Sequence, residues 1–237
     1  MKNLKMPACA VALLAVISTS ALAESVELSV KGTIIPAACA PSITGEINYG
    51  NVTAAQLSDT EYTVLDRKEV GFAINCGGPV KVAIQAINGR PGSVAGGEEV
   101  GDNSLAISPV ELLGNPEMVV AGLGTHNGDK IGGYTIGLLT DTLEADGNKM
   151  FMKLRRISDG WSAYPAGSIT PLYYQYHVFD DVLTYSWADS PATETPTAIT
   201  SLSAQFVVQA YLNNTSALGT SEAVQLNGLT TFELVYL

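Results

Sequence analysis

Few residues in this chain have the types and spacing that catalysis or metal binding requires. Covalent or acid–base catalysis needs a nucleophile beside a base, and a metal site needs several ligating side chains close together. The two histidines, His126 and His177, stand alone, and the chain contains neither a Gly-x-Ser-x-Gly nor a His-Glu-x-x-His motif. We therefore expect a protein that is not an enzyme and that uses no metal and no cofactor.

Two short segments match ligand-binding loops only in part. Residues 141–148 contain Asp141, Asp146 and Gly147 but lack the alternating oxygen ligands and the terminal Glu of a calcium loop. Gly122-Leu123-Gly124 lacks the third glycine and the βαβ context of a dinucleotide site. We interpret both segments as turns.

The first 23 residues predict a signal peptide. Lys2 and Lys5 precede an apolar stretch that ends in Ala21-Leu22-Ala23, and this stretch is too short to span a bilayer as a helix. We expect cleavage after Ala23, export to the periplasm and no membrane insertion. Loss of the two lysines makes the formal net charge of −11 more negative by two, which disfavours nucleic acid as a partner.

The three cysteines reduce to one pair after export. Cys9 leaves with the leader, so Cys39 and Cys76 remain in an oxidising compartment, where a disulfide is the default expectation. The chain-entropy model assigns about 4 kcal/mol of stabilisation to a disulfide that closes a loop of this length.

The rest of the chain predicts an all-β fold. Short runs rich in β-branched and aromatic residues alternate with clusters of Gly, Pro, Asn and Asp, as in a two-sheet sandwich. Gly77-Gly78-Pro79 predicts a hairpin turn within residues 70–87, and the Gly-rich residues 89–133 predict a long loop or an insertion. The expected strands are residues 26–35, 70–76, 80–87, 134–139, 150–157, 172–179, 199–212 and 230–237.

Both ends of the mature chain alternate between apolar and polar residues. Near the N-terminus, one strand face would hold Val26, Leu28, Val30, Gly32 and Ile34. At the other end, one face would hold Phe232, Leu234 and Tyr236, followed by the last residue, Leu237. The alternation at residues 26–34 equally fits an ordinary half-buried edge strand of the chain's own sheet.

These features together resemble the pilins of chaperone-usher pili. Pilins begin with an alternating donor strand that has a glycine in its apolar face, as Gly32 is here, and a cysteine such as Cys39 follows closely. They also end on an alternating strand with a penultimate tyrosine, which corresponds to Tyr236. The resemblance covers about a third of the mature chain. It is closest to a branch of longer, secreted fimbrial-subunit-like proteins.

The resemblance implies an incomplete immunoglobulin-like sandwich, the pilin fold, which a donor strand from another subunit completes. Residues 24–35 would be the donor-strand extension, and residues 36–237 a single domain with long insertions. Phe232, Leu234, Tyr236 and Leu237 would form the strand that faces a periplasmic chaperone and borders the acceptor groove. An outer-membrane usher would then assemble the subunits head to tail into a cell-surface fimbrium.

Two other interpretations remain open. One is a fimbrial tip adhesin that binds a glycan, although adhesins of this kind carry no donor strand. The other is a secreted β-sandwich carbohydrate-binding protein or enzyme, in which aromatic side chains form a sugar platform. The candidate aromatic residues are Trp161, Tyr164, Tyr173, Tyr174, Tyr176 and Trp187.

Overall fold

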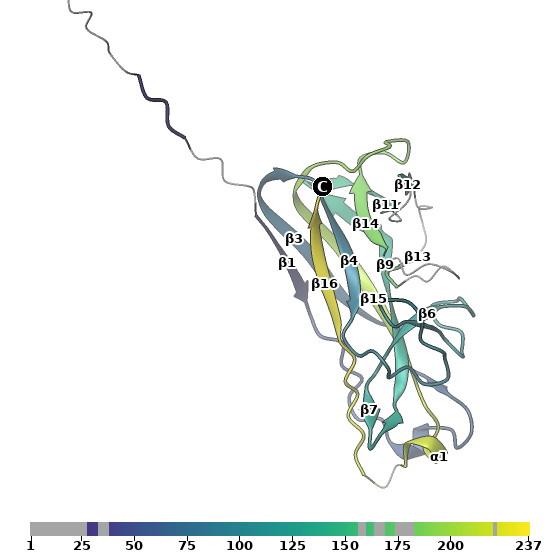
Figure 1. The fold of residues 1–237 in the computed structure, drawn as a ribbon. Helices are drawn as coiled ribbons and strands as arrows, with labels where there is room; N and C mark the ends of the chain where they lie inside the picture. The colour runs from purple at the N-terminus through teal and green to yellow at the C-terminus, as the bar shows by residue number, and fades with distance from the viewer. Residues whose placement is uncertain (1–27, 33–37, 156–159, 164–168, 174–182, 220–221) are drawn as a thin grey trace, which may run out of the picture. The chain divides into compact units, whose positions relative to one another are not determined.

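The computed structural model describes residues 28–32, 38–155, 160–163, 169–173, 183–219 and 222–237. The chain divides into two units, residues 1–35 and 36–237. In the first unit, the described residues 28–32 belong to no strand or helix, and the side chains of Leu28 and Val30 are 91% and 90% exposed. The second unit is a two-sheet sandwich, which confirms the expected all-β fold (Figure 1).

The larger sheet runs in the order β1-β3-β15-β9-β6-β5, and every pairing along this path is antiparallel. Three shorter strands join it: β2 pairs with β15, while β10 and β13 pair with β9. Its strands are β1 (Cys39–Thr44), β2 (Thr63–Val64), β3 (Lys68–Val80), β5 (Ala106–Ile107), β6 (Val119–Gly122), β9 (Gly132–Ala145), β10 (Asn148–Lys149), β13 (Ile169–Pro171) and β15 (Ile199–Leu212).

The smaller sheet runs in the order β12-β11-β14-β4-β16 and is also antiparallel. Its strands are β4 (Val82–Asn88), β11 (Phe151–Arg155), β12 (Trp161–Ala163), β14 (Thr184–Ala188) and β16 (Thr230–Tyr236). A separate hairpin consists of β7 (Thr125–His126) and β8 (Asp129–Lys130). The short helices are the 3-10 helix η1 (Ala54–Gln56) and α1 (Thr215–Leu218), which the side chain of Asn214 caps.

The expected hairpin over residues 70–87 is wrong. Strand β3 continues through Gly77-Gly78-Pro79 to Val80, and after Lys81 the chain enters β4 in the other sheet. Opposite the glycines, the pairing register with β15 jumps from Val80 at Ile199 to Asn75 at Ser201, so the Gly-Gly-Pro sequence forms a bulge. The chain therefore crosses here from one sheet of the sandwich to the other instead of turning back in a hairpin.

The core lies between the two sheets. The larger sheet contributes buried Phe72, Ile74 and Phe206, and the smaller sheet contributes Ile84 and Trp187. The phenyl rings of Phe72 and Phe206 stack with their centroids 4.5 Å apart. Interdigitating side chains of this kind hold the sheets of a sandwich together.

Residues 89–133 form an insertion with a small core of its own. Tyr211 of β15 faces this insertion, while its neighbours Ala210 and Leu212 belong to the main core. The hydroxyl of Tyr211 donates to the carbonyl oxygen of Ala95 at 2.5 Å. The insertion therefore covers the outer face of the larger sheet. Its core residues are Val94, Ala95, Ala106, Leu112, Met118 and Val120, with Tyr211.

Candidate functional site: a groove between two edge strands

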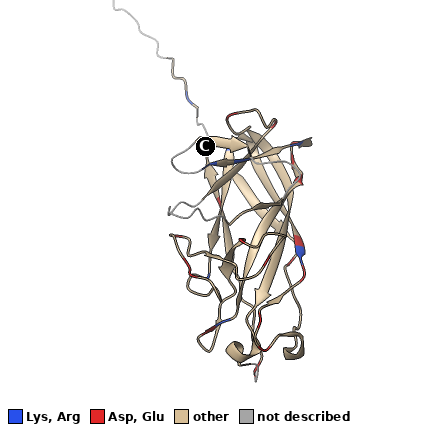
Figure 2. Ribbon diagram, turned by 90° about the vertical axis from the view of Figure 1, so that its right-hand side faces the viewer, with Lys and Arg blue, Asp and Glu red and all other residues tan. Residues whose placement is uncertain are grey.

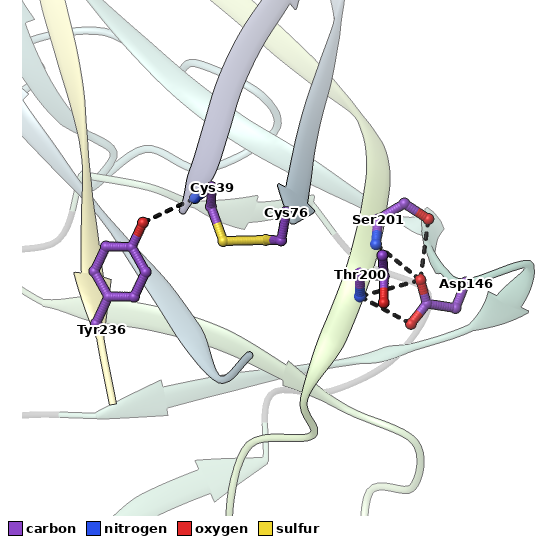
Figure 3. The surroundings of a disulfide bond; sticks show 6 residues. All are labelled: Cys39, Cys76, Asp146, Thr200, Ser201 and Tyr236. Carbon is purple, nitrogen blue, oxygen red and sulfur yellow. Dashed lines mark hydrogen bonds between the residues drawn. A yellow bond between two sulfur atoms is a disulfide. The ribbon is translucent and has the colours of Figure 1, made fainter. Parts of the chain in front are cut away.

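Strands β1 and β16 lie at neighbouring open edges of the two sheets (Figure 1). Within the described residues, β1 pairs with β3 alone and β16 pairs with β4 alone. The backbone N–H of Cys39 donates to the hydroxyl of Tyr236 at 2.9 Å, which connects the two edges at one end (Figure 3). Each strand thus keeps one row of backbone groups without a ladder partner in the described chain, and such rows can accept another strand.

The β16 side of the groove carries the apolar stripe that the sequence predicts. Phe232 and Leu234 are half-buried, and Tyr236 is 52% exposed. The ring of Phe232 reaches the core, with its centroid 5.0 Å from Phe206 and 5.9 Å from Phe72. The stripe points into the sandwich, but no strand of the described chain covers its outer edge.

The β1 side faces the core and is nevertheless exposed. The register pairs Pro41 with Ile74 and Ile43 with Phe72, and residues paired in this way share one face of a sheet. Ile74 and Phe72 are buried, whereas Pro41 is exposed and the side chain of Ile43 is 46% exposed. Core-facing residues with this much exposure indicate a position where a further strand would normally lie.

Residues 45–57 continue the β1 side beyond the strand. The half-buried side chains of Ile47, Tyr49, Val52 and Leu57 pack against the core. Burial raises the pKa of the Tyr49 hydroxyl to about 12. Among the described residues, the backbone–backbone hydrogen bonds of this segment are local, from Gln56 to Thr53 and from Leu57 to Ala54. Side chains alone therefore connect most of the segment to the sandwich.

Two adjoining hollows lie in the groove between residues 45–57 and the segment that leads into β16. The larger has a volume of about 240 Å³ and the smaller about 130 Å³, and both are lined by Leu226. The larger is lined by Ile47, Tyr49, Leu123, Tyr134, Ile136, Val208, Ala210, Leu226, Gly228 and Thr230. The smaller is lined by Gly50, Val52, Ala54, Leu57, Ile131, Leu212, Leu218, Glu222, Ala223, Val224 and Leu226.

The predicted disulfide between Cys39 and Cys76 is confirmed (Figure 3). It joins residues that face each other in the β1–β3 ladder and fixes the first residue of the groove's β1 side. Its partner strand β3 also carries the bulge described above. The bond therefore stiffens the end of the groove where Tyr236 meets Cys39.

The predicted donor residues fall partly within the described chain. Leu28, Val30 and Gly32 are exposed and pair with nothing there, while Val26 and Ile34 lie outside the described residues. Their assignment as a donor strand stays a prediction. Leu237 of the predicted chaperone-facing strand follows β16 and donates its backbone N–H to Lys81 at 3.0 Å.

Two further expectations concerned metal ligands and aromatic residues that could bind a sugar. The described residues contain no group of three or more His, Cys, Asp or Glu side chains that could hold a metal. Trp187 and Tyr173 are buried at 1% exposure, so they cannot contribute to a surface sugar platform. Trp161 is half-buried beside Arg155, and the other three candidate aromatic residues lie outside the described chain.

The charged residues and the helices suggest no additional site. Acidic and basic residues are scattered over the second unit rather than gathered in one patch (Figure 2). None of the helices in the described parts of the chain has the length and apolarity that a membrane crossing requires.

The two terminal stripes alone do not predict the whole groove. A further period-two signal runs through Pro41, Ile43, Gly45, Ile47 and Tyr49. A second run precedes β16, where Val224 and Leu226 are half-buried and their neighbours are exposed. Following the alternation inward from each terminal stripe finds both runs.

Comparison with known proteins finds relatives along the whole chain. Residues 28–135 match a family model described as "Protein of unknown function (DUF1120)". No solved structure matches the chain at a significant level. The chain is 25% identical to "Uncharacterized protein YhcF" of Escherichia coli (strain K12) over 232 residues, which cover 91% of this chain and 92% of that protein. It is similar over its full length to "Protein GltF" of the same strain, with 28% identity over 278 residues that cover 98% of that protein.

Proposed function

We propose that this protein is a structural subunit of a surface pilus and that donor-strand exchange polymerises it. The observation that carries the proposal is the groove along two open edges, β1 with its continuation 45–57 and β16 with the segment before it, where two hollows remain and apolar side chains stay partly exposed. The occupant is residues 24–35 of a second copy or of a related subunit. Its role is assembly, and the proposal includes no catalytic step.

The donor segment has the pattern that the groove requires. Its apolar residues recur at every second position, which spaces them about 6.8 Å apart in a strand. The segment 224–236 repeats the same period on the acceptor side. Burying Val26, Leu28, Val30 and Ile34 contributes about 6–12 kcal/mol before ordering costs, at about 1.5–3 kcal/mol for each side chain.

The exposed donor strand and the open groove also support the proposed assembly route. Leu28 and Val30 are almost fully exposed in the single chain, so a partner is needed to bury them. A periplasmic chaperone would cover the groove first, and an outer-membrane usher would exchange it for the next subunit's strand. Because the strand and the groove are different surfaces, the contact is heterologous and builds a filament.

Substituting Leu28→Asp tests the proposal. Leu28 is 91% exposed, so an aspartate there leaves the free subunit as stable as the wild type. In the polymer the same carboxylate would be buried in the groove without a partner, which prevents assembly. We expect wild-type yield of chaperone-bound subunit together with loss of heat-resistant polymer on denaturing gels.

Ser29→Asp is the matched control, because residue 29 points to the opposite face of the same strand. This variant should polymerise like the wild type. If Leu28→Asp lowers the yield of the chaperone complex and the free subunit's stability, the strand belongs to its own chain's fold and the proposal is wrong.

A further inference from the structure

The wall of the larger hollow contains a glycine, Gly228. Gly228 lies between Leu226 and Thr230, and all three line the hollow. A Cβ atom at this position would come within 2.8 Å of Tyr134 Cε1 and 3.1 Å of Leu123 Cδ2, and both residues line the same hollow. A side chain at position 228 would therefore press against the Tyr134 ring and the Leu123 side chain that form the wall of the hollow.

Backbone conformation does not demand this glycine. Gly228 is absent from the glycines with positive φ, such as Gly124 and Gly219, where an L-residue would be strained. The φ angle at this position is therefore not one that only glycine adopts readily. The glycine therefore provides space rather than a special conformation.

The surrounding structure holds this part of the groove at a fixed width. The N–H of Asn227 donates to the carbonyl oxygen of Leu123 at 3.0 Å, and Arg90 donates to the carbonyl oxygen and to Oδ1 of Asn227 at 2.8 and 2.7 Å. The hydroxyl groups of Tyr134 and Thr230 lie 2.7 Å apart in a hydrogen bond. These bonds hold the chain before residue 228 and the Tyr134 ring in place, so the room for a larger residue at position 228 would have to come from the hollow.

The volume of the hollow indicates which chemical group it takes. About 240 Å³ exceeds the roughly 150 Å³ of an apolar cavity that binds benzene. Apart from three hydroxyl-bearing residues, Tyr49, Tyr134 and Thr230, its lining is aliphatic or glycine. One complete aliphatic side chain of an alternating strand fits this space.

We propose that Gly228 is the specificity-determining residue of the groove. By leaving the hollow open, it admits one large aliphatic side chain of the incoming strand and so sets the register in which that strand binds. This inference rests on the proposed function. A subunit with a larger residue at this position would select a strand that has a small residue at the matching place.

The test pairs an enlarged groove residue with a shortened strand residue. The acceptor is the full mature chain carrying Leu28→Asp, which prevents its own residues 24–35 from binding in a groove. The probe is a labelled synthetic peptide of residues 24–35. Adding Gly228→Val should weaken peptide binding by about tenfold or more, as overpacking does. Four further peptides each carry one alanine, at position 26, 28, 30 or 34. One of these four should bind the Gly228→Val groove more tightly than the unchanged peptide binds it. Gly160→Val is the control, because a Cβ atom at residue 160 meets nothing within 4 Å.

Each outcome of this experiment decides between the two proposals. Unchanged binding to Gly228→Val, or rescue by none of the four shortened peptides, overturns the role of Gly228 and leaves the proposed function intact. Failure of the unchanged peptide to bind the Gly228 groove overturns both proposals. If Gly228→Val does not fold, the smaller Gly228→Ala replaces it. The same outcomes apply to that variant: unchanged binding, or rescue by none of the four shortened peptides, overturns the role of Gly228.

Discussion

At the scale of single residues, Asp146 shows how one side chain supports a break in a sheet. Strand β15 has its register jump between Ile199 and Ser201, and Thr200 lies within the jump. The carboxylate of Asp146, in the turn after β9, accepts hydrogen bonds from the N–H groups of Thr200 and Ser201 and from the Ser201 hydroxyl (Figure 3). Residues 141–148, which match a calcium loop only in part, thus include a turn whose carboxylate accepts hydrogen bonds from the backbone of β15.

The same hydrogen bonds, led by the one from the Thr200 N–H, lower the pKa of Asp146 below its ordinary value of 3.8. A lowered folded-state pKa means that this carboxylate stabilises the fold above about pH 4, and that the stabilisation is lost as the pH falls through the folded-state pKa. We expect Asp146→Asn to lower the free energy of unfolding at pH 7, with the difference from wild type shrinking toward pH 2. Urea unfolding at several pH values measures this.

Asp141→Asn is the control for that measurement. Asp141 forms an exposed ion pair with Lys149 at 3.3 Å, and such surface pairs contribute little to stability. A constant difference between Asp146→Asn and wild type across the pH range would show that the carboxylate's charge has no role in holding β15.

At the scale of elements, the two sides of the groove are held in different ways. The β16 side is a paired strand, with seven residues from Thr230 to Tyr236 in register against β4. The opposite side begins as β1, which is paired with β3, but its continuation at residues 45–57 contacts the core through side chains, and the backbone–backbone hydrogen bonds of this continuation within the described chain are local. A donor strand would therefore add the missing ladder to a segment whose side chains are already in place.

Hydrogen exchange tests this difference between the two sides. Amides of residues 46–52 should exchange rapidly in the free subunit and become protected when the 24–35 peptide binds, because they gain backbone partners. Amides in the middle of β15, which is paired on both sides, should be protected in both states and serve as the reference. Peptide binding without added protection at residues 46–52 would contradict pairing along this side.

At the scale of the whole molecule, the proposed contact is directional. The donor strand lies in residues 24–35 and the groove lies within residues 36–237, so each copy has one surface of each kind. A self-complementary contact would instead place the same patch on both partners and close into a dimer. The two arrangements respond differently when one surface is disabled.

Mixing two complementary variants distinguishes these arrangements. Leu28→Asp disables the strand and keeps the groove, while Leu226→Asp places a carboxylate between the two hollows and keeps the strand. Neither variant should polymerise alone, and their mixture should form a heterodimer that grows no further. Size-exclusion chromatography with light scattering measures the mass. Long polymers in the mixture, or no complex at all, would contradict a head-to-tail contact.

Local patterns in the sequence predicted much of the fold. Alternation over residues 199–212 predicted β15 with its observed bounds, and residues 230–237 predicted β16 to within one residue. The count of exported cysteines predicted the disulfide. Strand bounds depend on the alternation of neighbouring residues, and the disulfide depends on export of the chain with two cysteines. Both can therefore be predicted from local features of the sequence.

Pairing partners and sheet membership were decided by the tertiary structure. Alternation shows which residues share a face, but it does not show which strand lies beside them or where a strand changes sheets. For that reason Gly77-Gly78-Pro79 suggested a turn but forms a bulge, and the described residues 172–173 of an expected strand form a bend. The groove likewise exists because β1 and β16, nearly two hundred residues apart, end at neighbouring edges of two sheets. Long-range packing alone brings those edges together, with the core-facing side chain of Ile43 still 46% exposed and that of Leu234 only half-buried.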